Sequence, residues 1–251
     1  MTGDAVAPPF RAEHCADVGP WDSASLARLR EWDPEWADAC ATMATNPWRR
    51  GTLSPKFVEL VSLGLAMACT NLDAQATRRH MRAALAAGAT RQELLFVVKC
   101  ATVLSIHSCS VAAPILLEEA QASGVERVPR TRDEATPACD AMHATGQWND
   151  AWNPIFDLDP VWTDQFMATG VGIYQSGVMS AKDVELLSIA LDASFTHLYS
   201  PGIRRHIKGA LQAGATTQEI MDVLKLCVAQ GVQAANLGVA ILAQELNGDG
   251  S

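Results

Sequence analysis

Apolar residues follow helical spacing through most of this chain. Thr77, Met81 and Ala84 recur at intervals of three and four residues, as do Ile203 and Ile207. Four segments are apolar on nearly every face: residues 55–69, 91–105, 181–195 and 217–230. No segment alternates apolar and polar residues, and no Asn-Gly or Asp-Gly turn joins two apolar runs. The pattern therefore predicts an all-α fold.

Capping residues mark equivalent helix starts in the two halves of the chain. Ser54 and Ser200 each precede a proline, which suits the first helical position because it lacks an N–H. Thr90 and Thr216 are each followed three residues later by a glutamate, as in a capping box. These four residues predict where helices begin.

The chain contains one unit twice. Arg78-Arg79-His80 recurs as Arg204-Arg205-His206, an offset of 206 − 80 = 126 residues, and the same offset carries Glu59 onto Glu185. No insertion or deletion is needed over the aligned stretches, which indicates a duplicated domain. We expect a first repeat over residues 23–120, a linker over residues 121–150 and a second repeat over residues 151–247.

Composition limits the partners of the protein. The net charge of −9 argues against nucleic acid or an anionic membrane, because both favour basic surfaces. The first twenty residues contain no apolar stretch, and apolar runs such as residues 94–106 are too short to span a bilayer. Helices apolar on every face need cover that a repeat of about 110 residues cannot supply, which predicts a homo-oligomer. The seven cysteines form no Cys-x-x-Cys pair, as expected for free thiols in the cytoplasm.

A histidine and a glutamate stand in apolar surroundings in both repeats. His80 and His206 lie on the apolar sides of their helices, where a lone histidine is usually a structural core residue. Glu59 and Glu185 interrupt the most apolar helix of each repeat, so partial desolvation would suit them to proton transfer. The alternatives are structural.

Lysines provide those structural alternatives. Lys56 and Lys182 lie three residues before the glutamates, so each glutamate could instead belong to a surface ion pair. Lys99 and Lys225 lie inside apolar helices, and the same glutamates would neutralise them. We expect this second pairing.

The repeats differ at positions that could contact a substrate. The second repeat has His197 and Tyr199 where the first has Asn71 and Asp73. Later in the repeat, a second set of positions also differs: Gln233 and Asn236 replace His107 and Ser110. Such divergence indicates that the two repeats no longer do identical work. A metal site is a further possibility, but the nine-residue spacing of the two histidines at 197 and 206 matches no usual ligand pattern, so no metal is expected.

Several of these residues carry a family likeness. The segment from Arg205 to Leu211, followed by Gly214-Ala215-Thr216 and Glu219-Ile220, resembles the pattern H-x-x-A-L-x-x-G-A-T-x-x-E-I of the carboxymuconolactone decarboxylase family. The segment from Gly231 to Asn236 resembles the glycine-containing segment that follows it in decarboxylase members. The segment from His80 to Leu94 repeats the first part of the pattern.

The thiol peroxidases of the same superfamily carry a Glu…Cys-x-x-Cys-x-x-x-His signature that this chain lacks. Leu72 follows Cys69 by three positions, and Phe195 and Leu198 occupy both places in the second repeat. A thiol peroxidase is therefore not expected, because neither the nucleophile nor its resolving partner is present.

The family resemblance implies two tandem helical domains that form a pseudo-dimer, so that a trimer of this chain would replace six single-domain subunits. It also implies a cofactor-free decarboxylase of an unsaturated lactone or another acid from aromatic breakdown. We expect catalytic roles for His206, Glu185, His80, Glu59 and His197. The expected substrate-binding residues are Tyr199, Gln233, Asn236 and His107.

In this hypothesis His206 returns a proton to carbon, and Glu185 sets its protonation state. The same groups would serve an isomerase or another carbon–carbon lyase. A non-catalytic oligomeric binding module is the competing hypothesis, in which the repeated motifs serve packing alone.

Overall fold

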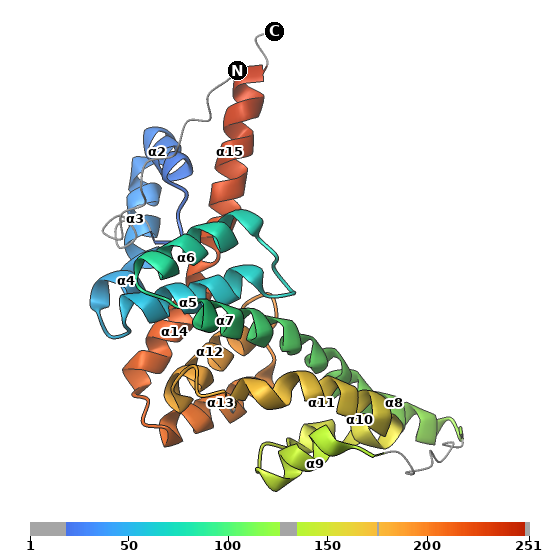
Figure 1. The fold of residues 1–251 in the computed structure, drawn as a ribbon. Helices are drawn as coiled ribbons and strands as arrows, with labels where there is room; N and C mark the ends of the chain where they lie inside the picture. The colour runs from blue at the N-terminus through green and yellow to red at the C-terminus, as the bar shows by residue number, and fades with distance from the viewer. Residues whose placement is uncertain (1–18, 126–134, 175, 249–251) are drawn as a thin grey trace, which may run out of the picture. The chain divides into compact units, whose positions relative to one another are not determined.

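The computed structural model describes residues 19–125, 135–174 and 176–248, and over these ranges every regular element is a helix (Figure 1). The elements of the first half are α2 (Ser23–Trp32), α3 (Pro34–Ala44), α4 (Asn46–Arg50), α5 (Pro55–Met67), α6 (Ala74–Ala86), α7 (Arg91–Val103), η1 (Leu104–Ile106) and α8 (His107–Ala122). Those of the second half are α9 (Pro137–Ala144), η2 (Asp150–Trp152), α10 (Asn153–Leu158), α11 (Pro160–Tyr174), α12 (Ala181–Ala193), α13 (Ser200–Gln212), α14 (Thr217–Ala229) and α15 (Val232–Gly248). The all-α prediction is confirmed.

The chain folds into two compact units that combine the repeats differently from the sequence. Unit 1 contains residues up to Ala101 together with those from Ser180 onward, and unit 2 contains Thr102–Met179. Unit 1 therefore holds the hairpins α5–α6 and α12–α13 of both repeats. The residue ranges of the two repeats, and of the linker between them, stay a prediction.

In unit 1, α5 packs against α12, and α14 packs on both. The approach is close at Gly64, where a Cβ atom would lie 3.2 Å from Val97 and 3.3 Å from Leu187. Thr70 and Thr196, which occupy equivalent positions in the repeats, join their hydroxyl oxygens at 3.0 Å. Contact between equivalent residues is the mark of a two-fold arrangement, so the repeats form the expected pseudo-dimer.

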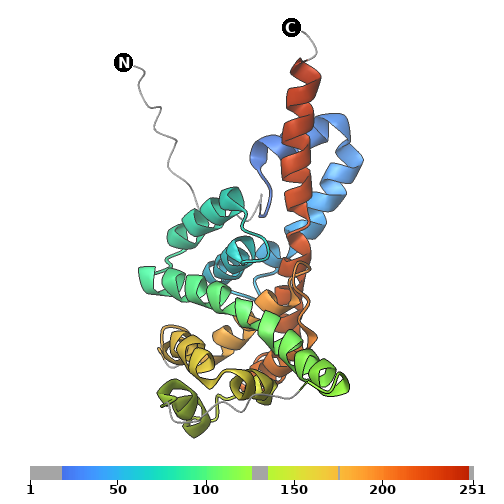
Figure 2. The ribbon, with the colours of Figure 1, turned by 90° about the vertical axis from the view of Figure 1, so that its right-hand side faces the viewer.

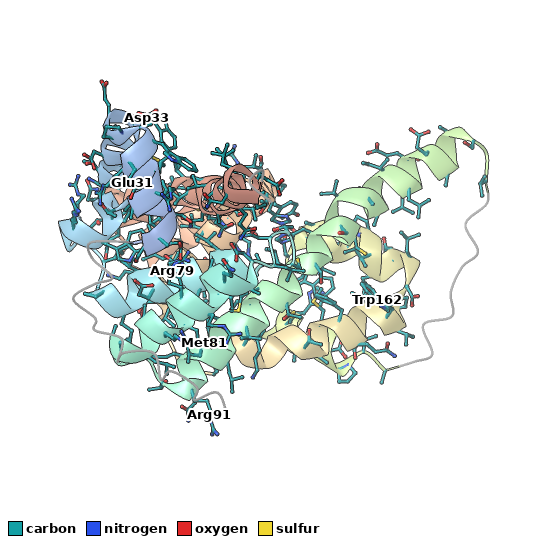
Figure 3. All side chains as sticks on the ribbon, turned by 90° about the horizontal axis from the view of Figure 1, so that it is seen from above. Glu31, Asp33, Arg79, Met81, Arg91 and Trp162 are labelled. Carbon is teal, nitrogen blue, oxygen red and sulfur yellow. The ribbon has the colours of Figure 1, made fainter. Side chains whose placement is uncertain are left out.

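The N-terminal helices of unit 1 lie along α15. Figures 1 and 2 both show α2 beside this long helix, and the two elements are in contact. Their shared core includes Trp21, Leu26 and Val232. The Arg79 guanidinium of α6 (labelled in Figure 3) connects α6 to the segment before α2 by donating a hydrogen bond to the Pro20 carbonyl at 2.8 Å.

Unit 2 is a small helical cluster with two apolar centres. One contains Ile106, Ala113 and Ile155 and joins α8 to α10. The other contains Cys139, Met142 and Met167 and joins α9 to α11. Trp162 of α11, labelled in Figure 3, is 41% exposed and adds little to either centre.

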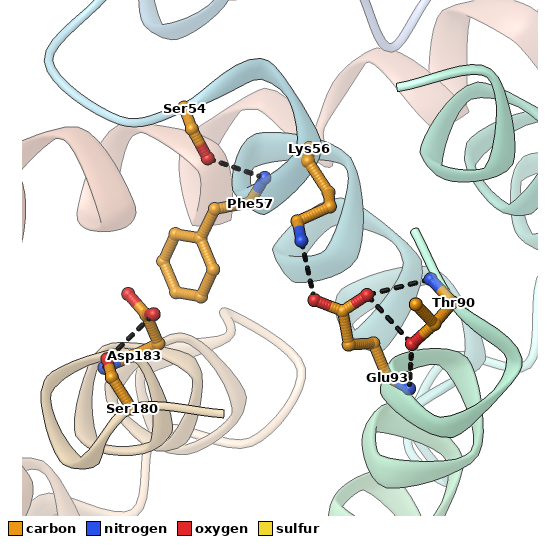
Figure 4. A network of polar contacts seen from close by, with 7 residues as sticks. All are labelled: Ser54, Lys56, Phe57, Thr90, Glu93, Ser180 and Asp183. Atoms are coloured by element: carbon orange, nitrogen blue, oxygen red, sulfur yellow. Dashed lines mark hydrogen bonds and ion pairs between the residues drawn. The ribbon is translucent and has the colours of Figure 1, made fainter. Parts of the chain in front are cut away.

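Three of the four predicted caps form in the structure. The fourth prediction is wrong, because α13 already begins at Ser200 and its N-cap residue, Tyr199, makes no side-chain cap hydrogen bond. Figure 4 shows the Ser54 hydroxyl accepting from the Phe57 N–H at 3.2 Å. Thr90 and Glu93 exchange hydrogen bonds as a capping box, with the Glu93 carboxylate accepting from the Thr90 N–H at 2.7 Å. Thr216 forms the corresponding box in the second repeat. Short-range signals were therefore sufficient to place these helix starts.

The predicted lysine partners are wrong. Lys56 binds Glu93 at 2.6 Å (Figure 4), and Lys182 binds Glu219 at 2.7 Å. Each bond joins residues 37 positions apart on different helices and leaves the glutamates at 59 and 185 free of these lysines. Lys99 is exposed, so it needs no buried partner.

Lys225 instead pairs with Asp222 at 2.7 Å and donates to Asn46 at 3.2 Å. The Asp222 residue is 1% exposed, so its pairing keeps a buried carboxylate neutralised. Although burial acts in the opposite direction, hydrogen bonds from Lys225 and Thr52 lower the pKa of this carboxyl. This contact fixes α14 of the second repeat to α4 of the first.

Two helical stretches are longer than the apolar runs predicted from the sequence. Residues 91–122 and residues 217–247 form helical stretches of 32 and 31 residues, and a turn at Gln230 and Gly231 interrupts the second. Both have the length and composition of a membrane span, with mean hydropathies of 1.8 and 1.6. The core helices of soluble proteins meet the same criteria, so length and composition alone do not assign these helices to a membrane.

Candidate active site

The first repeat closes its histidine and glutamate into a buried cluster. Glu59 of α5 bonds the Nδ1 atom of His80 of α6 at 2.8 Å, with side chains 4% and 5% exposed. Trp48 of α4 donates its indole N–H to the other Glu59 oxygen at 2.6 Å and stacks on the imidazole. Both carboxylate oxygens are thus engaged by protein groups, which is the arrangement expected of a structural buried charge.

The second repeat builds the same pair in a more open setting. Glu185 of α12 bonds the Nδ1 atom of His206 of α13 at 2.7 Å. The His206 side chain is 7% exposed, while that of Glu185 is 27% exposed. A carboxylate on Nδ1 fixes the ring and leaves Nε2 as the atom that can act on another molecule.

A carboxylate that the sequence did not single out faces this second nitrogen. The Asp192 Oδ2 atom lies 3.7 Å from His206 Nε2, within ion-pair range but beyond a hydrogen bond. Burial raises the pKa of the Asp192 carboxyl to about 7 from its ordinary 3.8, although Arg205 acts in the opposite direction. The imidazole therefore stands between two carboxyl groups.

Two glycines of α13 make room for these carboxyl groups. A Cβ atom on Gly209 would lie 2.6 Å from the carboxyl carbon of Glu185, and one on Gly202 would overlap the Asp192 carboxylate. The first repeat has alanine at both equivalent positions, Ala83 and Ala76. Only the second repeat is shaped to receive two acids beside its histidine.

The loop before α13 brings two predicted residues to this place. The Tyr199 N–H donates to the Asp192 carbonyl at 2.9 Å, and Tyr199 is 7% exposed. His197 is half-buried, and burial lowers its pKa. One of its ring nitrogens lies within 4.8 Å of an Asp192 carboxylate oxygen, and its ring centroid lies 6.0 Å from that of Tyr199.

This loop holds an unusual backbone conformation in both repeats. Leu198 has a φ of 52° and its equivalent Leu72 a φ of 54°, in the left-handed region that leucine seldom adopts. Such a conformation is kept where the surroundings determine it, and it is often associated with functional loops. Here it places His197 and Tyr199 on either side of the strained residue.

The other predicted substrate-binding residues are Asn236, Gln233 and His107. Asn236 of α15 has a structural role, since its side-chain oxygen accepts from the Asp22 N–H at 2.9 Å and its NH₂ group donates to the Pro20 carbonyl at 3.0 Å. Gln233 lies half-buried in the first turn of α15. His107 begins α8 in unit 2. Neither of the two α15 residues has a described contact with His206.

The described residues of unit 1 do not by themselves define a metal centre. Asp192 and His197 offer two ligand atoms at short distance. Protein zinc sites use three or four protein ligands, with His nitrogen about 2 Å from the metal. Within this unit the two groups lie near each other, and Asp192 also lies beside His206.

The sequence missed three features of this site. Asp192 belongs to no motif, and the sequence alone gives no role to Gly202 or Gly209. The comparison of the repeats carried the signal, because Asp192 replaces Ala66 while Gly202 replaces Ala76. A new carboxylate and a lost methyl group at facing positions indicate that the pair changed together.

Comparisons with known proteins place the chain in a family. The carboxymuconolactone decarboxylase family matches residues 34–107 and 160–244, one stretch in each repeat. A solved structure from Burkholderia xenovorans LB400, provisionally assigned as a gamma-carboxymuconolactone decarboxylase subunit, is similar along 97% of this chain and 100% of its own, with 30% identity and a TM-score of 0.84. No curated protein matched the chain. The two matched stretches together cover more than half of the sequence, and the chain therefore belongs to the carboxymuconolactone decarboxylase family.

Proposed function

We propose that this protein is a cofactor-independent lyase that removes CO₂ from an unsaturated lactone acid, with His206 as its proton donor. The observation that carries the proposal is the His206–Glu185 pair, whose Nε2 atom stays available while Nδ1 is held at 2.7 Å. The family match in both repeats supports a reaction of this class. An acid derived from aromatic breakdown is the substrate class we propose.

The chemistry needs few groups. The electrons of the broken carbon–carbon bond pass into a dienolate as CO₂ leaves, and the negative charge develops on the carbonyl oxygen of the lactone. Hydrogen-bond donors near that oxygen stabilise the charge. His197 and Tyr199 are our candidates for this role, because both lie beside Asp192. His206 then gives the Nε2 proton to carbon, and Glu185 stabilises the imidazolium before transfer.

The two repeats have different tasks in this proposal. Both oxygens of the Glu59 carboxylate are hydrogen-bonded, one to His80 and the other to Trp48, and the three side chains form a closed cluster. Glu185 is 27% exposed, compared with 4% for Glu59. We therefore assign catalysis to the second repeat and a structural role to the first pair.

Thiol chemistry is not part of the proposal. Cys69 is exposed in the α5–α6 connection but has Leu72 where a resolving thiol would stand. Burial raises the pKa of the Cys100 and Cys227 thiols to about 12, so these groups stay protonated and unreactive. A cytoplasmic location, which we also propose, fits the free state of the cysteines in the described ranges.

We also propose that the protein works as a homo-oligomer, most simply a trimer. Exposed apolar residues recur at equivalent positions of α8 and α15, three on each helix: Val111, Ile115 and Leu116, and Leu237, Ile241 and Leu242. Each of these is at least 47% exposed in the single chain, and such surfaces mark association sites. Light scattering of the purified protein tests this assembly.

The experiment that tests the function uses γ-carboxymuconolactone as the probe, with CO₂ release and product structure both followed. Release of CO₂ supports the lyase. Rearrangement of the probe without CO₂ release would favour the isomerase alternative. Binding of the probe with no chemical change would favour the non-catalytic binding module. His206→Ala should abolish turnover while circular dichroism shows an intact helical fold. An active, folded His206→Ala variant removes the proposed role.

A further inference from the structure

We propose that Asp192 is a second acid–base residue of this site, which reloads the Nε2 atom of His206 with a proton after each turnover. The inference rests on the proposed decarboxylation and goes beyond it, because it assigns the proton route. It starts from one geometric fact: the Asp192 Oδ2 atom lies 3.7 Å from that nitrogen.

Decarboxylation makes a proton supply necessary. The substrate carboxylate loses CO₂ and gains one proton on carbon, so every turnover consumes a proton from solution. A histidine that has donated is neutral and must be protonated again before the next cycle. His206 is 6% exposed, so direct access of water to its ring is limited. A neighbouring acid shortens this step.

The position of Asp192 serves that step. It lies on α12, is 2% exposed and faces the nitrogen opposite the one held by Glu185. A small ring or side-chain movement brings 3.7 Å to the hydrogen-bond distance needed for transfer. The carboxylic acid proton then passes to Nε2, Asp192 becomes a carboxylate, and a proton from solvent restores the acid.

The surroundings suit an acid that is loaded at neutral pH. Burial raises the pKa of Asp192 to about 7. The charged and titratable groups in unit 1 that face it are the imidazoles of His206 and His197 and the Arg205 guanidinium. A proton donor works best when its pKa is near the working pH, because it is then both loaded and able to give the proton away.

The internal repeat argues that this carboxylate has no packing task. The first repeat has Ala66 at the equivalent position and folds the same helical hairpin without an acid. A buried carboxyl group costs stability, and Gly202 replaces Ala76 to leave room for it. A buried carboxyl group that destabilises the fold, in a space left free by a glycine, is typical of a functional site.

The test compares the first turnover with later turnovers in rapid-mixing experiments on the whole protein with γ-carboxymuconolactone. Asp192→Asn keeps the shape and removes the acid. We expect its first turnover to stay within about twofold of the wild type, since the first turnover does not depend on reloading His206. Later turnovers should slow by about tenfold or more, which gives a burst. Asp222→Asn removes another buried carboxylate and should give no burst.

Two results would overturn the relay. Equal slowing of the first and later turnovers in Asp192→Asn would show a structural role, and unchanged rates in both phases would show no role. Failure of the proposed function itself looks different, because the wild type would then release no CO₂ from the probe. Failure of the role of His206 would leave His206→Asn active whatever Asp192→Asn does.

A second readout needs no substrate. Infrared spectra of protein with ¹³C-labelled aspartate should show a carboxylic-acid C=O band at neutral pH that Asp192→Asn lacks. Absence of that band from the wild type down to about pH 5 means that Asp192 is ionised there and cannot deliver a proton. That outcome also overturns the proposal.

Discussion

Replacing Asp192 by asparagine is expected to stabilise the protein, and the gain should depend on pH. The carboxyl group is 2% exposed, and its pKa rises from an ordinary 3.8 to about 7 on folding. The unfolded chain therefore binds fewer protons than the folded chain between these two values. Stability contributed by this group falls as pH rises through that window and is lowest above about pH 7.

The magnitude follows from the same two values. At about 1.4 kcal/mol for each pH unit, a rise from 3.8 to about 7 corresponds to a cost of about 4 kcal/mol above neutrality. The asparagine side chain carries no ionisation cost, so the advantage of Asp192→Asn should be small near about pH 4 and approach this limit near about pH 8.

Urea unfolding followed by circular dichroism at these two pH values measures the effect. Asp222→Asn is the matched control, because Asp222 is also buried but is held ionised by Lys225. Its loss should destabilise the protein at neutral pH. If Asp192→Asn shows the same stability difference at both pH values, or a loss at the higher one, the reasoning about this carboxyl group is refuted.

Three further substitutions test other parts of the site. Gly209→Ala should lower kcat by about tenfold or more, because the added Cβ atom would displace the Glu185 carboxylate. A variant that gains stability and keeps full activity, as expected for an ordinary helical glycine, would contradict this prediction. Trp48→Phe should cost about 1–3 kcal/mol in urea unfolding, since it removes a donor from the buried Glu59, and a neutral effect would speak against the closed cluster. Hydrogen bonds from Lys182 and Thr216 lower the pKa of Glu219 below its ordinary value of 4.5, although burial acts in the opposite direction. The ionised Glu219 therefore contributes stability above pH 4.5, and this contribution is lost as the pH falls through the pKa of the folded protein. Glu219→Gln should flatten this part of the thermal-unfolding profile, and an unchanged profile would exclude the pair as its source.

The fold could be predicted because its determinants are local or repeated. Capping residues such as Thr216 fix helix starts within three or four residues of sequence. The offset of 126 residues brought Glu59 and Glu185 to attention with His80 and His206, and the structure joins each of them to the histidine of its own repeat. Recurrence in both repeats was the useful signal.

The partners of the lysines could not be predicted, because they depend on how helices cross. Lys56 has glutamates at two distances in sequence, and it binds Glu93, 37 residues away, in preference to the glutamate three residues away. Asn236 holds the segment at Asp22, more than two hundred residues earlier in the chain. Sequence spacing contains no information on either contact.

Asp192 was missed for a different reason. Asp192 belongs to no motif, and its role becomes apparent only from the space that Gly202 leaves on the facing helix. Reading the two repeats against each other for paired changes, here Ala66 with Ala76, would have found it. Differences between the repeats were as informative as what they share.

The central claim is that catalysis belongs to the imidazole of the second repeat. The most direct measurement is kcat for CO₂ release from γ-carboxymuconolactone by His206→Asn and His80→Asn, each compared at equal concentration of folded protein. The account predicts that His206→Asn loses about a hundredfold or more while His80→Asn loses stability and keeps its turnover. Equal losses in the two variants, or a larger loss in His80→Asn, would contradict it.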